Sequence, residues 1–434
     1  FILIDMKIKS VFSLVFSWFV FLKNRRWKNN AVKAQKKMMF FLVNKAKRTV
    51  FGKDHSFSSI KNYTDFKKQI PIRDYEDLDP YIQKIILGKR NVLWPGKPIY
   101  FSKTSGTTSG TKYIPISAES MPNHIIAARD AILNYIWETK NTSIVNGKMI
   151  FLQGSPELSK TGGILTGRLS GIVAHHIPFY LRKNRLPSFE ANCIEDWEKK
   201  VDAIVEETFS KKMSVISGIP PWVKMYFDRL NEKSGKLIKE VFPDFSLFIY
   251  GGVNYRPYQK GLERLIGKKI ASIELYPASE GFIAYQDSQK KHGKLLCVNH
   301  GNFYEFIASD DFFKKTRERI TLADVKIGVN YVIILNTSAG LWGYNLGDTI
   351  TFVSTNPYRI VVTGRIKHFT SAFGEHVIAE VVERSLKEVL KIIPAQVNEF
   401  HVAPQVNPKK GLPYHEWFVE FDKKPKDISV FKQL

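Results

Sequence analysis

The sequence predicts an α/β fold with a mostly parallel sheet, and two observations support this prediction. From Pro98 onward, short β-branched and aromatic runs alternate with amphipathic helical patterns, which is the order of elements in sheets flanked by helices. In addition, 44% of the residues are hydrophobic and 13% are aromatic, so this chain of 434 residues can bury a large core in two or three domains. This composition excludes an intrinsically disordered chain.

The first part of the chain, residues 7 to about 90, is predicted to form helices joined by loops. Apolar residues recur at helical spacing between Val32 and Val50. An apolar stretch from Val11 to Leu22 has 12 residues, too few to cross a bilayer, and a basic run from Lys23 to Lys28 follows it where an exported protein would have a cleavage site. We therefore expect a helix packed on the domain and no stable membrane insertion, with loose attachment to a membrane surface as the alternative.

The second part is predicted to alternate strands and helices. The clearest helix covers Ile194 to Phe209, where apolar side chains form one stripe. The expected strands are Ile99–Phe101, Tyr113–Ile116, Met149–Leu152, Val215–Ser217, Leu247–Tyr250, Ile270–Leu275, Leu295–Val298, Tyr331–Asn336, Ile350–Val353 and Arg359–Val362.

The net charge of +24 raises the question of a polyanionic partner. The basic residues occur in short lysine clusters throughout the chain and form no long stripe interleaved with aromatic residues. We interpret the charge as serving solubility and substrate attraction and expect no nucleic acid partner. The two cysteines, Cys193 and Cys297, are too few for a zinc site or a disulfide framework, which indicates a reducing compartment and a cytoplasmic location.

The run from Thr104 to Lys112 is the most informative stretch of the sequence. Its glycines let the backbone approach an anion, its hydroxyl and amide groups can donate to phosphate oxygens, and Lys112 offsets their charge. The flanking strands are expected to hold this phosphate-binding loop. It is not the loop of P-loop nucleotide-binding proteins, because Thr111 precedes the lysine and Tyr113 follows it. The alternative is an ordinary solvated turn.

Three polar clusters adjoin predicted strands, where ligands of open α/β sheets bind. Gly251-Gly252-Val253 follows one strand, Tyr276 to Glu280 follows the next, and Leu346-Gly347-Asp348 precedes a third. The glycine pair is either a tight turn or a flat surface for a purine. Glu280 is either an exposed acid or a ligand of Mg²⁺ that bridges phosphates. Asp348 either stabilises a turn or accepts hydrogen bonds from the hydroxyls of a ribose.

In their order along the chain, these motifs resemble those of the acyl-acid amido synthetases. Plant members of this auxin-responsive family conjugate auxin and jasmonate to amino acids, and the chain looks like its bacterial branch, within the wider adenylate-forming ligase superfamily. The resemblance extends from about Ile60 to the end of the chain. It is carried by Thr104–Lys112 with Tyr113-Ile114-Pro115, by Tyr276–Glu280 and by Tyr344–Asp348.

The resemblance implies how this chain would bind ATP and Mg²⁺. The residues expected to hold the phosphates are Ser105, Gly106, Thr107, Thr108, Ser109, Gly110 and Lys112. The residues expected around adenine are Gly251, Gly252, Val253 and Tyr276. Ser279 would contact the α-phosphate, Asp348 the ribose and Glu280 the Mg²⁺. Arg365 would lie near the ribose or a phosphate, and Glu280, Lys112 and Arg365 are the expected catalytic residues.

The resemblance also implies two domains. Residues 1–363 would form a large N-terminal domain with mixed, mostly parallel sheets flanked by helices, and residues 364–434 a small, mobile α+β C-terminal domain. Gly364 to Lys367 and Phe373 to Glu375 resemble the hinge, although His368 stands where the superfamily commonly has Asp or Lys. An adenylation lysine is expected near the end of this domain, and no Gly-Lys pair follows Gly411, so we expect the small domain to be incomplete.

The function implied is that of an ATP- and Mg²⁺-dependent ligase that adenylates a carboxylic acid and transfers the acyl group to an amino acid or another amine. A thiol acceptor such as coenzyme A is one alternative. The other is a basic, non-enzymatic protein that binds nucleic acid or a membrane. Glu280 and Asp348 favour a nucleotide–metal site, because carboxylates at the mouth of a polyanion-binding surface would repel its ligand.

Overall fold

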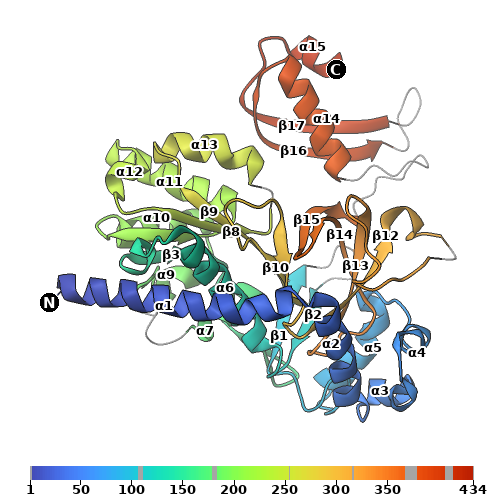
Figure 1. Ribbon diagram of the computed structural model, residues 1–434. Helices are drawn as coiled ribbons and strands as arrows, with labels where there is room; N and C mark the ends of the chain where they lie inside the picture. Colours follow the sequence, from blue (N-terminus) through green and yellow to red (C-terminus); the bar gives the residue numbers. More distant parts are fainter. Residues whose placement is uncertain are drawn as a thin grey trace.

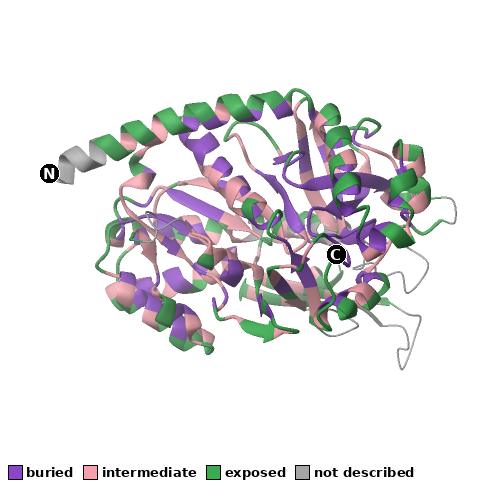
Figure 2. Cartoon of the chain, turned by 90° about the horizontal axis from the view of Figure 1, so that it is seen from below, coloured by how far each residue is buried: buried purple, intermediate pink, exposed green. Residues whose placement is uncertain are grey.

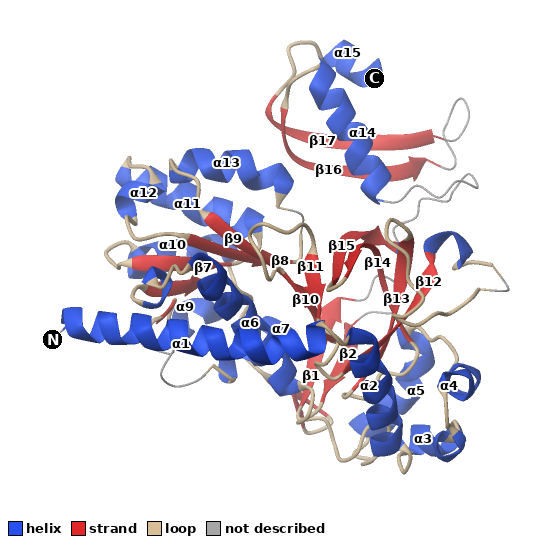
Figure 3. Ribbon diagram, viewed as in Figure 1, coloured by secondary structure: helices blue, strands red, loops and turns tan. Residues whose placement is uncertain are grey.

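The computed structural model describes residues 2–105, 111–177, 183–253, 255–314, 317–366, 379–405 and 414–433. Within these residues, a large mixed sheet crosses the molecule with helices on both faces, and a smaller sheet lies beside it (Figures 1 and 3). The predicted α/β class is therefore confirmed.

The N-terminal part is helical, as predicted. Its helices are α1 (Ile2–Lys28), α2 (Ala31–Ala46), α3 (Val50–Asp54), α4 (Tyr63–Gln69) and α5 (Tyr75–Ile86), with a short 3-10 turn η1 (Phe57–Ser59). Helix α1 extends beyond the predicted apolar stretch at both ends and packs along α6 (Met121–Thr139), so the expected helix packed on the domain is confirmed. None of the described helices combines the length and the apolar character needed to cross a bilayer.

One half of the large sheet is parallel. In spatial order, its strands are β6 (Arg185–Leu186), β3 (Lys148–Phe151), β7 (Met213–Ser217), β8 (Leu247–Gly251) and β9 (Ala271–Ala278). The connecting elements are η2 (Ser143–Val145), α7 (Leu169–His175), α9 (Phe189–Cys193), α10 (Trp197–Thr208), α11 (Pro220–Ser234), α12 (Ile238–Val241) and α13 (Arg256–Ile266). Neighbouring side chains on a strand point to opposite faces, so Val215 packs in the core shared with α6, whereas Ile216 packs in the core shared with α10 and α11.

The other half of the large sheet is antiparallel. Its strands are β10 (Gly281–Tyr285), β11 (Lys294–Leu296), β15 (Tyr358–Arg365), β14 (Tyr344–Thr355), β13 (Asn330–Thr337) and β12 (Asn302–Ala308), and the 3-10 turn η3 (Ser309–Asp311) follows β12. The expectation of a mostly parallel sheet is therefore corrected, since the described part of this sheet has four parallel and six antiparallel neighbouring pairs. After β9, the connections from β9 to β10, from β13 to β14 and from β14 to β15 are short, which favours antiparallel pairing, whereas 21 residues (309–329) separate β12 from β13.

The smaller sheet contains β2 (Thr111–Ile116), β1 (Tyr100–Ser105), β5 (Ile164–Gly167) and β4 (Ser159–Thr161) in that spatial order. The C-terminal elements are α14 (Ala379–Ile392), β16 (Gln396–Gln405), β17 (Tyr414–Lys423) and α15 (Ile428–Gln433), so the expected α+β character holds for their described residues (Figure 1). The domain boundary at residues 363 and 364 and the incompleteness of the small domain stay predictions.

Each predicted strand corresponds to a strand of the structure, and several are longer than predicted. Strand β9 continues through Ala278, so Tyr276 lies inside it, and β14 begins at Tyr344, so Asp348 lies inside β14 rather than before it. The sequence analysis placed no strand at β10 or β12. Strand β10 is buried on both faces and strand β12 nearly so, and this gives their sequences no alternation of apolar and polar residues.

A buried ion pair joins the N-terminal helices to the large sheet. Arg319 and Glu305 are 4% and 0% exposed, and Arg319 Nε lies 2.9 Å from Glu305 Oε1. Asn336 Nδ2 donates to the other carboxylate oxygen at 2.9 Å. Arg319 Nη2 donates to the carbonyl oxygens of Lys67 and Ile70 at the end of α4, at 2.9 and 2.8 Å. This contact therefore fixes α4 against β12. Figure 2 shows the buried residues of the sheet layers.

We predict that Arg319→Leu destabilises the protein by about 3–5 kcal/mol, because it leaves the Glu305 carboxylate buried without its cation. Chemical denaturation with urea measures this change. The matched control is Arg317→Leu, which removes an exposed arginine of the same segment and is expected to change the free energy of unfolding by less than about 0.5 kcal/mol. Equal losses in the two variants would contradict a specific role for the buried pair.

Candidate functional site

The hydroxyl-rich loop lies between two paired strands, as predicted. Strand β1 ends at Ser105 and β2 begins at Thr111, and these two residues are antiparallel partners. Loop residues Gly106, Thr107, Thr108, Ser109 and Gly110 lie outside the described residues, so their roles stay predictions.

Lys112 lies in β2, and its Nζ is 5.3 Å from the centre of the Tyr75 ring. An ammonium group at this distance is attracted by the face of the ring. The Tyr75 hydroxyl accepts a hydrogen bond from the backbone N–H of Tyr113 at 2.9 Å. The first turn of α5 is therefore fixed beside the strand that leaves the loop.

Ser279 and Glu280 form the turn between β9 and β10, at the carboxyl end of β9. The Oγ atoms of Ser279 and Ser102 are 2.8 Å apart and share a hydrogen bond. Ser102 is fully buried in β1. This contact brings the turn that carries Glu280 next to the strand that enters the hydroxyl-rich loop. The sequence analysis assigned no role to Ser102, although a serine within the apolar part of a strand was the available signal.

A bulge positions Asp348. Between the pairs Asn345–Ile334 and Thr349–Val332, strand β14 has three residues opposite Ile333 of β13. The middle residue of the three, Gly347, has φ +83°, a left-handed conformation that glycine adopts without a steric penalty. A bulge bends its strand and redirects the neighbouring side chains. Local backbone geometry thus places Asp348, whereas the sequence predicted either a turn-stabilising residue or an acceptor for ribose hydroxyls before a strand.

The carboxylate of Asp348 joins three of the predicted site residues. The Tyr276 hydroxyl of β9 donates to Oδ2, and Nε of Arg365, the partner of Asp348 across β14 and β15, lies 2.8 Å from Oδ1. The side chain of Asp348 is 15% exposed and that of Arg365 is 56% exposed. A carboxylate oxygen can accept more than one hydrogen bond, and the hydroxyls of a ligand are donors that suit a carboxylate.

Glu280 lies beside this cluster. The Tyr344 hydroxyl donates to its Oε1 at 3.4 Å. Burial raises the pKa of the Glu280 carboxyl, and the nearby Asp348 carboxylate raises it further, against the opposing effect of Arg365. A divalent cation would favour the ionised form of this half-buried carboxyl. The site therefore fits a cation.

The described residues contain no group of three or more His, Cys, Asp or Glu side chains arranged to hold a metal. A complete cage of protein ligands is therefore absent from the part of the chain that the structure describes. Magnesium is commonly held by one or two carboxylates together with substrate phosphates, so a single protein carboxylate such as that of Glu280 is sufficient.

The glycine pair predicted to face adenine lies at the end of β8. Gly251 pairs with Leu275 of β9, and a Cβ on Gly251 would lie 2.5 Å from the Leu275 carbonyl oxygen. Gly252 has φ +84° and is exposed, as is Val253. The three residues are therefore near Tyr276 along the adjacent strand, with their backbone accessible, and the adenine role stays a prediction.

A polar network behind Asp348 was not foreseen. Asn345 Oδ1 accepts a hydrogen bond from the backbone N–H of Gly347, and Asn345 Nδ2 donates to Asp74 at the start of α5, both at 3.0 Å. Asn345 and Tyr344 belong to the motif that carries Asp348, which was the available signal. The network connects the bulge in β14, which contains Asp348, to the start of α5.

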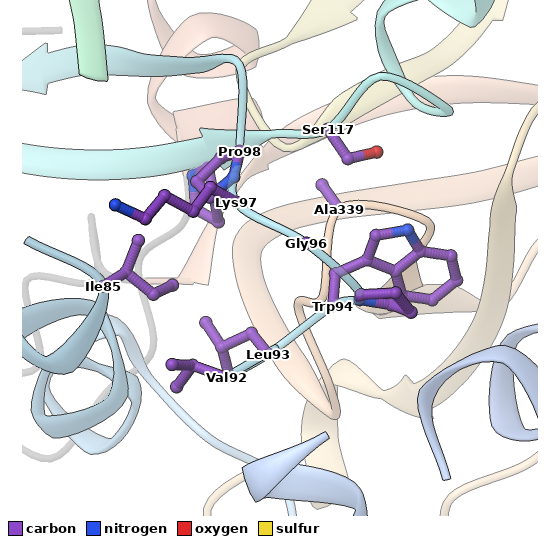
Figure 4. Close-up of a pocket in the computed structure, with 11 residues that line it drawn as sticks. Ile85, Val92, Leu93, Trp94, Gly96, Lys97, Pro98, Ser117 and Ala339 are labelled. Atoms are coloured by element: carbon purple, nitrogen blue, oxygen red, sulfur yellow. The ribbon is translucent and has the colours of Figure 1, made fainter. Parts of the chain in front are cut away.

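A small cavity near Trp94 and Leu93 is shown in Figure 4. Its volume of about 10 Å³ leaves room for about one water molecule. None of the predicted site residues lines it, so it is separate from the cluster around Asp348.

Comparisons with known proteins find family models and relatives that match this chain. The family model described as GH3 family N-terminal domain matches residues 23–193, and the GH3 family central domain matches residues 295–365. A jasmonoyl–L-amino acid synthetase of Oryza sativa subsp. japonica is 34% identical over 66% of this chain and 61% of its own length. One of Nicotiana attenuata is 24% identical over 66% of this chain and 60% of its own length. The chain thus spans about three fifths of the length of these curated relatives.

Solved structures share the fold. The GH3.15 acyl acid amido synthetase aligns with a TM-score of 0.78 and 14% identity, over 94% of this chain and 82% of that chain. A 2-hydroxyisobutyryl-CoA ligase in complex with its acyl adenylate aligns with a TM-score of 0.59 and 12% identity, over 93% of this chain and 79% of that chain.

We predict that Tyr276→Phe lowers the free energy of unfolding by about 1.5–3 kcal/mol, because it removes a hydrogen bond to a charged carboxylate. Urea denaturation measures the loss. Tyr258→Phe, at a half-buried tyrosine on α13, is the control and is expected to change stability by less than about 0.5 kcal/mol. If the control loses as much as Tyr276→Phe, the loss does not come from the contact with Asp348.

We predict that Glu280 makes stability depend on pH. Because its pKa is raised on folding, protonation of Glu280 favours the folded state. That stabilisation is fully present below the unfolded pKa of about 4.3 and is lost as the pH rises through the raised folded pKa. As the pH rises through this range, the free energy of unfolding of the wild type should therefore fall relative to that of Glu280→Gln. Urea denaturation in the presence of a chelator at several pH values measures this difference. The exposed control Glu318→Gln should follow the wild type, and a pH-independent difference for Glu280→Gln would refute the titration.

Proposed function

Because this chain belongs to the GH3 family, we propose that it is a ligase that uses ATP and Mg²⁺ to adenylate a carboxylic acid and then transfers the acyl group to an amino acid or another amine. The observation that carries the proposal is the cluster in which Tyr276, Asp348 and Arg365 meet beside Glu280. This pairing of carboxylates with one exposed guanidinium suits a nucleotide, which presents hydroxyls and phosphates together.

Asp348 is the proposed acceptor for the ribose hydroxyls. Tyr276 and Arg365 hold its carboxylate in one orientation, so the acceptor is fixed before the ligand arrives. Arg365 is more than half exposed, which leaves much of its guanidinium free to face a phosphate.

Glu280 is the proposed ligand of Mg²⁺. When bound, Mg²⁺ would neutralise charge on the phosphates and on the departing pyrophosphate. The chain keeps the Glu280 carboxyl half-buried. Its Oε1 accepts a hydrogen bond from the Tyr344 hydroxyl, and that hydrogen bond does not involve Oε2.

The phosphates are proposed to lie between the hydroxyl-rich loop and the Ser279 turn. The hydrogen bond between the Ser102 and Ser279 hydroxyls fixes the distance between β1, which enters the loop, and the Ser279 turn. Lys112 lies beside Tyr75 and supplies a positive charge at the base of the loop. Fixed donors aimed at an anion stabilise developing charge without reorganisation during the reaction.

One relative is named as a jasmonoyl–L-amino acid synthetase and another as an indole-3-acetic acid-amido synthetase. We propose the same class of reaction here, a carboxylic acid and an amine joined as an amide. We also propose a cytoplasmic location, which suits the two free cysteines, Cys193 and Cys297.

We predict that calorimetric titration with Mg²⁺-ATP gives one saturable site, and that Asp348→Ala weakens binding at least about tenfold, or about 1.4 kcal/mol. Glu280→Ala should remove only the part of the affinity that depends on Mg²⁺, measured by repeating the titration in a chelator. Glu318→Ala, at an exposed carboxylate, is the matched control and should bind as the wild type does.

An ATP affinity indifferent to Asp348 would refute the proposed site. The acceptor is then tested by incubating the protein with ATP, a set of carboxylic acids and either amino acids or coenzyme A, with mass spectrometry of the products. An amide supports the proposal, whereas a thioester alone would replace the amine by a thiol acceptor.

A further inference from the structure

Helix α1 buries two polar side chains beside the apolar Val20 and Trp27, and it exposes most of the apolar residues between Ile8 and Lys28. Ser17 and Asn24, which face the protein, are 0% and 2% exposed, whereas Phe12 and Phe19 are 71% and 57% exposed. The exposed apolar side chains recur at helical spacing and so form one continuous surface, here called the α1 apolar face. The α1 apolar face consists of Ile8, Val11, Phe12, Val15, Phe16, Trp18, Phe19 and Leu22.

Polar contacts hold α1 in this orientation. Asn24 Nδ2 donates to Asp130 of α6 at 2.9 Å, and Asn24 Oδ1 accepts a hydrogen bond from Trp27 Nε1 at 3.0 Å. Lys28 Nζ forms an ion pair with Asp287 at 2.9 Å. Rotation of α1 to bury its apolar side would break these contacts. The outward direction of the α1 apolar face is therefore built into the fold, and Figure 2 shows the exposed side of the helix along the edge of the molecule.

The charge around the α1 apolar face has one sign. Residues 6–53 contain 13 Lys and Arg and no Asp or Glu. On α1 itself, exposed Lys9 precedes the main part of the apolar face and exposed Lys23, Arg25 and Arg26 follow it. On the adjoining α2, the exposed cations are Lys33, Lys36, Lys37 and Lys45.

A basic cavity adjoins the amino-terminal half of α1. Asn146 Nδ2 donates to Ser10 Oγ of α1 at 3.2 Å. The same asparagine lines a cavity of about 250 Å³ together with Lys148, Lys211 and Lys212. An anionic group of phosphate size would fit a cavity of this volume and charge.

We propose that α1 binds the surface of a membrane that contains anionic phospholipids, with its apolar face among the acyl chains and its flanking cations among the headgroups. An exposed apolar helix face rich in Phe and Trp and bordered by Lys and Arg is typical of helices that lie in the membrane interface. A contiguous exposed apolar patch on a protein surface marks an interaction site.

The charge argues against the other occupants. A second copy of the chain would place two strongly basic surfaces together, which like-charge repulsion disfavours. A nucleic acid would satisfy the cations but leave the α1 apolar face in water. This inference does not rest on the proposed ligase activity, since it uses only the surface of α1 and its surroundings.

The test is co-sedimentation of the full chain with vesicles of phosphatidylcholine alone or mixed with phosphatidylserine. We expect binding to the mixed vesicles that weakens with salt and binding at least about tenfold weaker to the neutral ones. The variant with Phe12→Ser, Phe16→Ser and Phe19→Ser should lose at least about tenfold in partitioning, because three exposed aromatic side chains no longer enter the acyl region. The variant with Lys23→Gln and Arg26→Gln should lose about fivefold for each charge removed.

Matched controls distinguish binding through the α1 apolar face from nonspecific binding through other exposed aromatic or basic residues. Phe189, Phe313 and Phe418 are 53%, 61% and 52% exposed on other elements, so their triple serine variant should bind as the wild type does. Lys89→Gln with Arg90→Gln, in the exposed turn after α5, is the matched charge control. The proposal is overturned if the wild type ignores the mixed vesicles, if it binds neutral vesicles equally well, or if the test and control variants behave alike. Concentration-dependent dimerisation that the triple Phe variant abolishes would identify a second copy as the occupant and would also overturn it.

Discussion

The hydrogen-bonded carboxylate of Asp348 is the interaction on which the candidate site depends. Its two oxygens take partners from opposite sides, Tyr276 from the end of the parallel half of the sheet and Arg365 from the antiparallel half. Because β9 and β14 are not neighbours in the sheet, no backbone pairing joins them directly. The Asp348 side chain therefore adds a direct contact between the two halves, beside the hydrogen bond from Tyr344 of β14 to Glu280. A small shift between the halves would change the geometry of the carboxylate before it changed the fold.

The α/β class and the predicted strands could be read from the sequence, because β-branched runs alternate visibly with amphipathic helices. The switch to antiparallel pairing after β9 could not, since it depends on a two-residue turn at Ser279 and Glu280 that reads like any strand end. Tyr276, Asp348 and Arg365 were found through motifs whose order is distinctive. Ser102, Tyr344 and Asn345 were missed as contributors because their roles arise from contacts across the chain, which a single sequence does not display.

Helix α1 illustrates how a correct local prediction can miss the orientation of an element. Its apolar stretch predicted a helix packed on the domain, and the helix does pack on α6. The side that packs carries the polar anchors Asn24 and Lys28. It also buries the apolar side chains of Val20 and Trp27, whereas most apolar residues of the helix face outward. Buried hydrogen bonds thus act together with apolar contacts in orienting this helix.

The two halves of the sheet, which meet at β9, carry the predicted site residues on different kinds of structure. In the parallel half, the predicted adenine residues Gly252 and Val253 lie on the connection that follows β8, and connections vary more freely in length than strands do. In the antiparallel half, Asp348 and Arg365 lie within paired strands, where a substitution disturbs a hydrogen-bonded ladder. Descendants of such a fold can therefore diversify what they recognise by remodelling one half while inheriting their chemistry unchanged from the other.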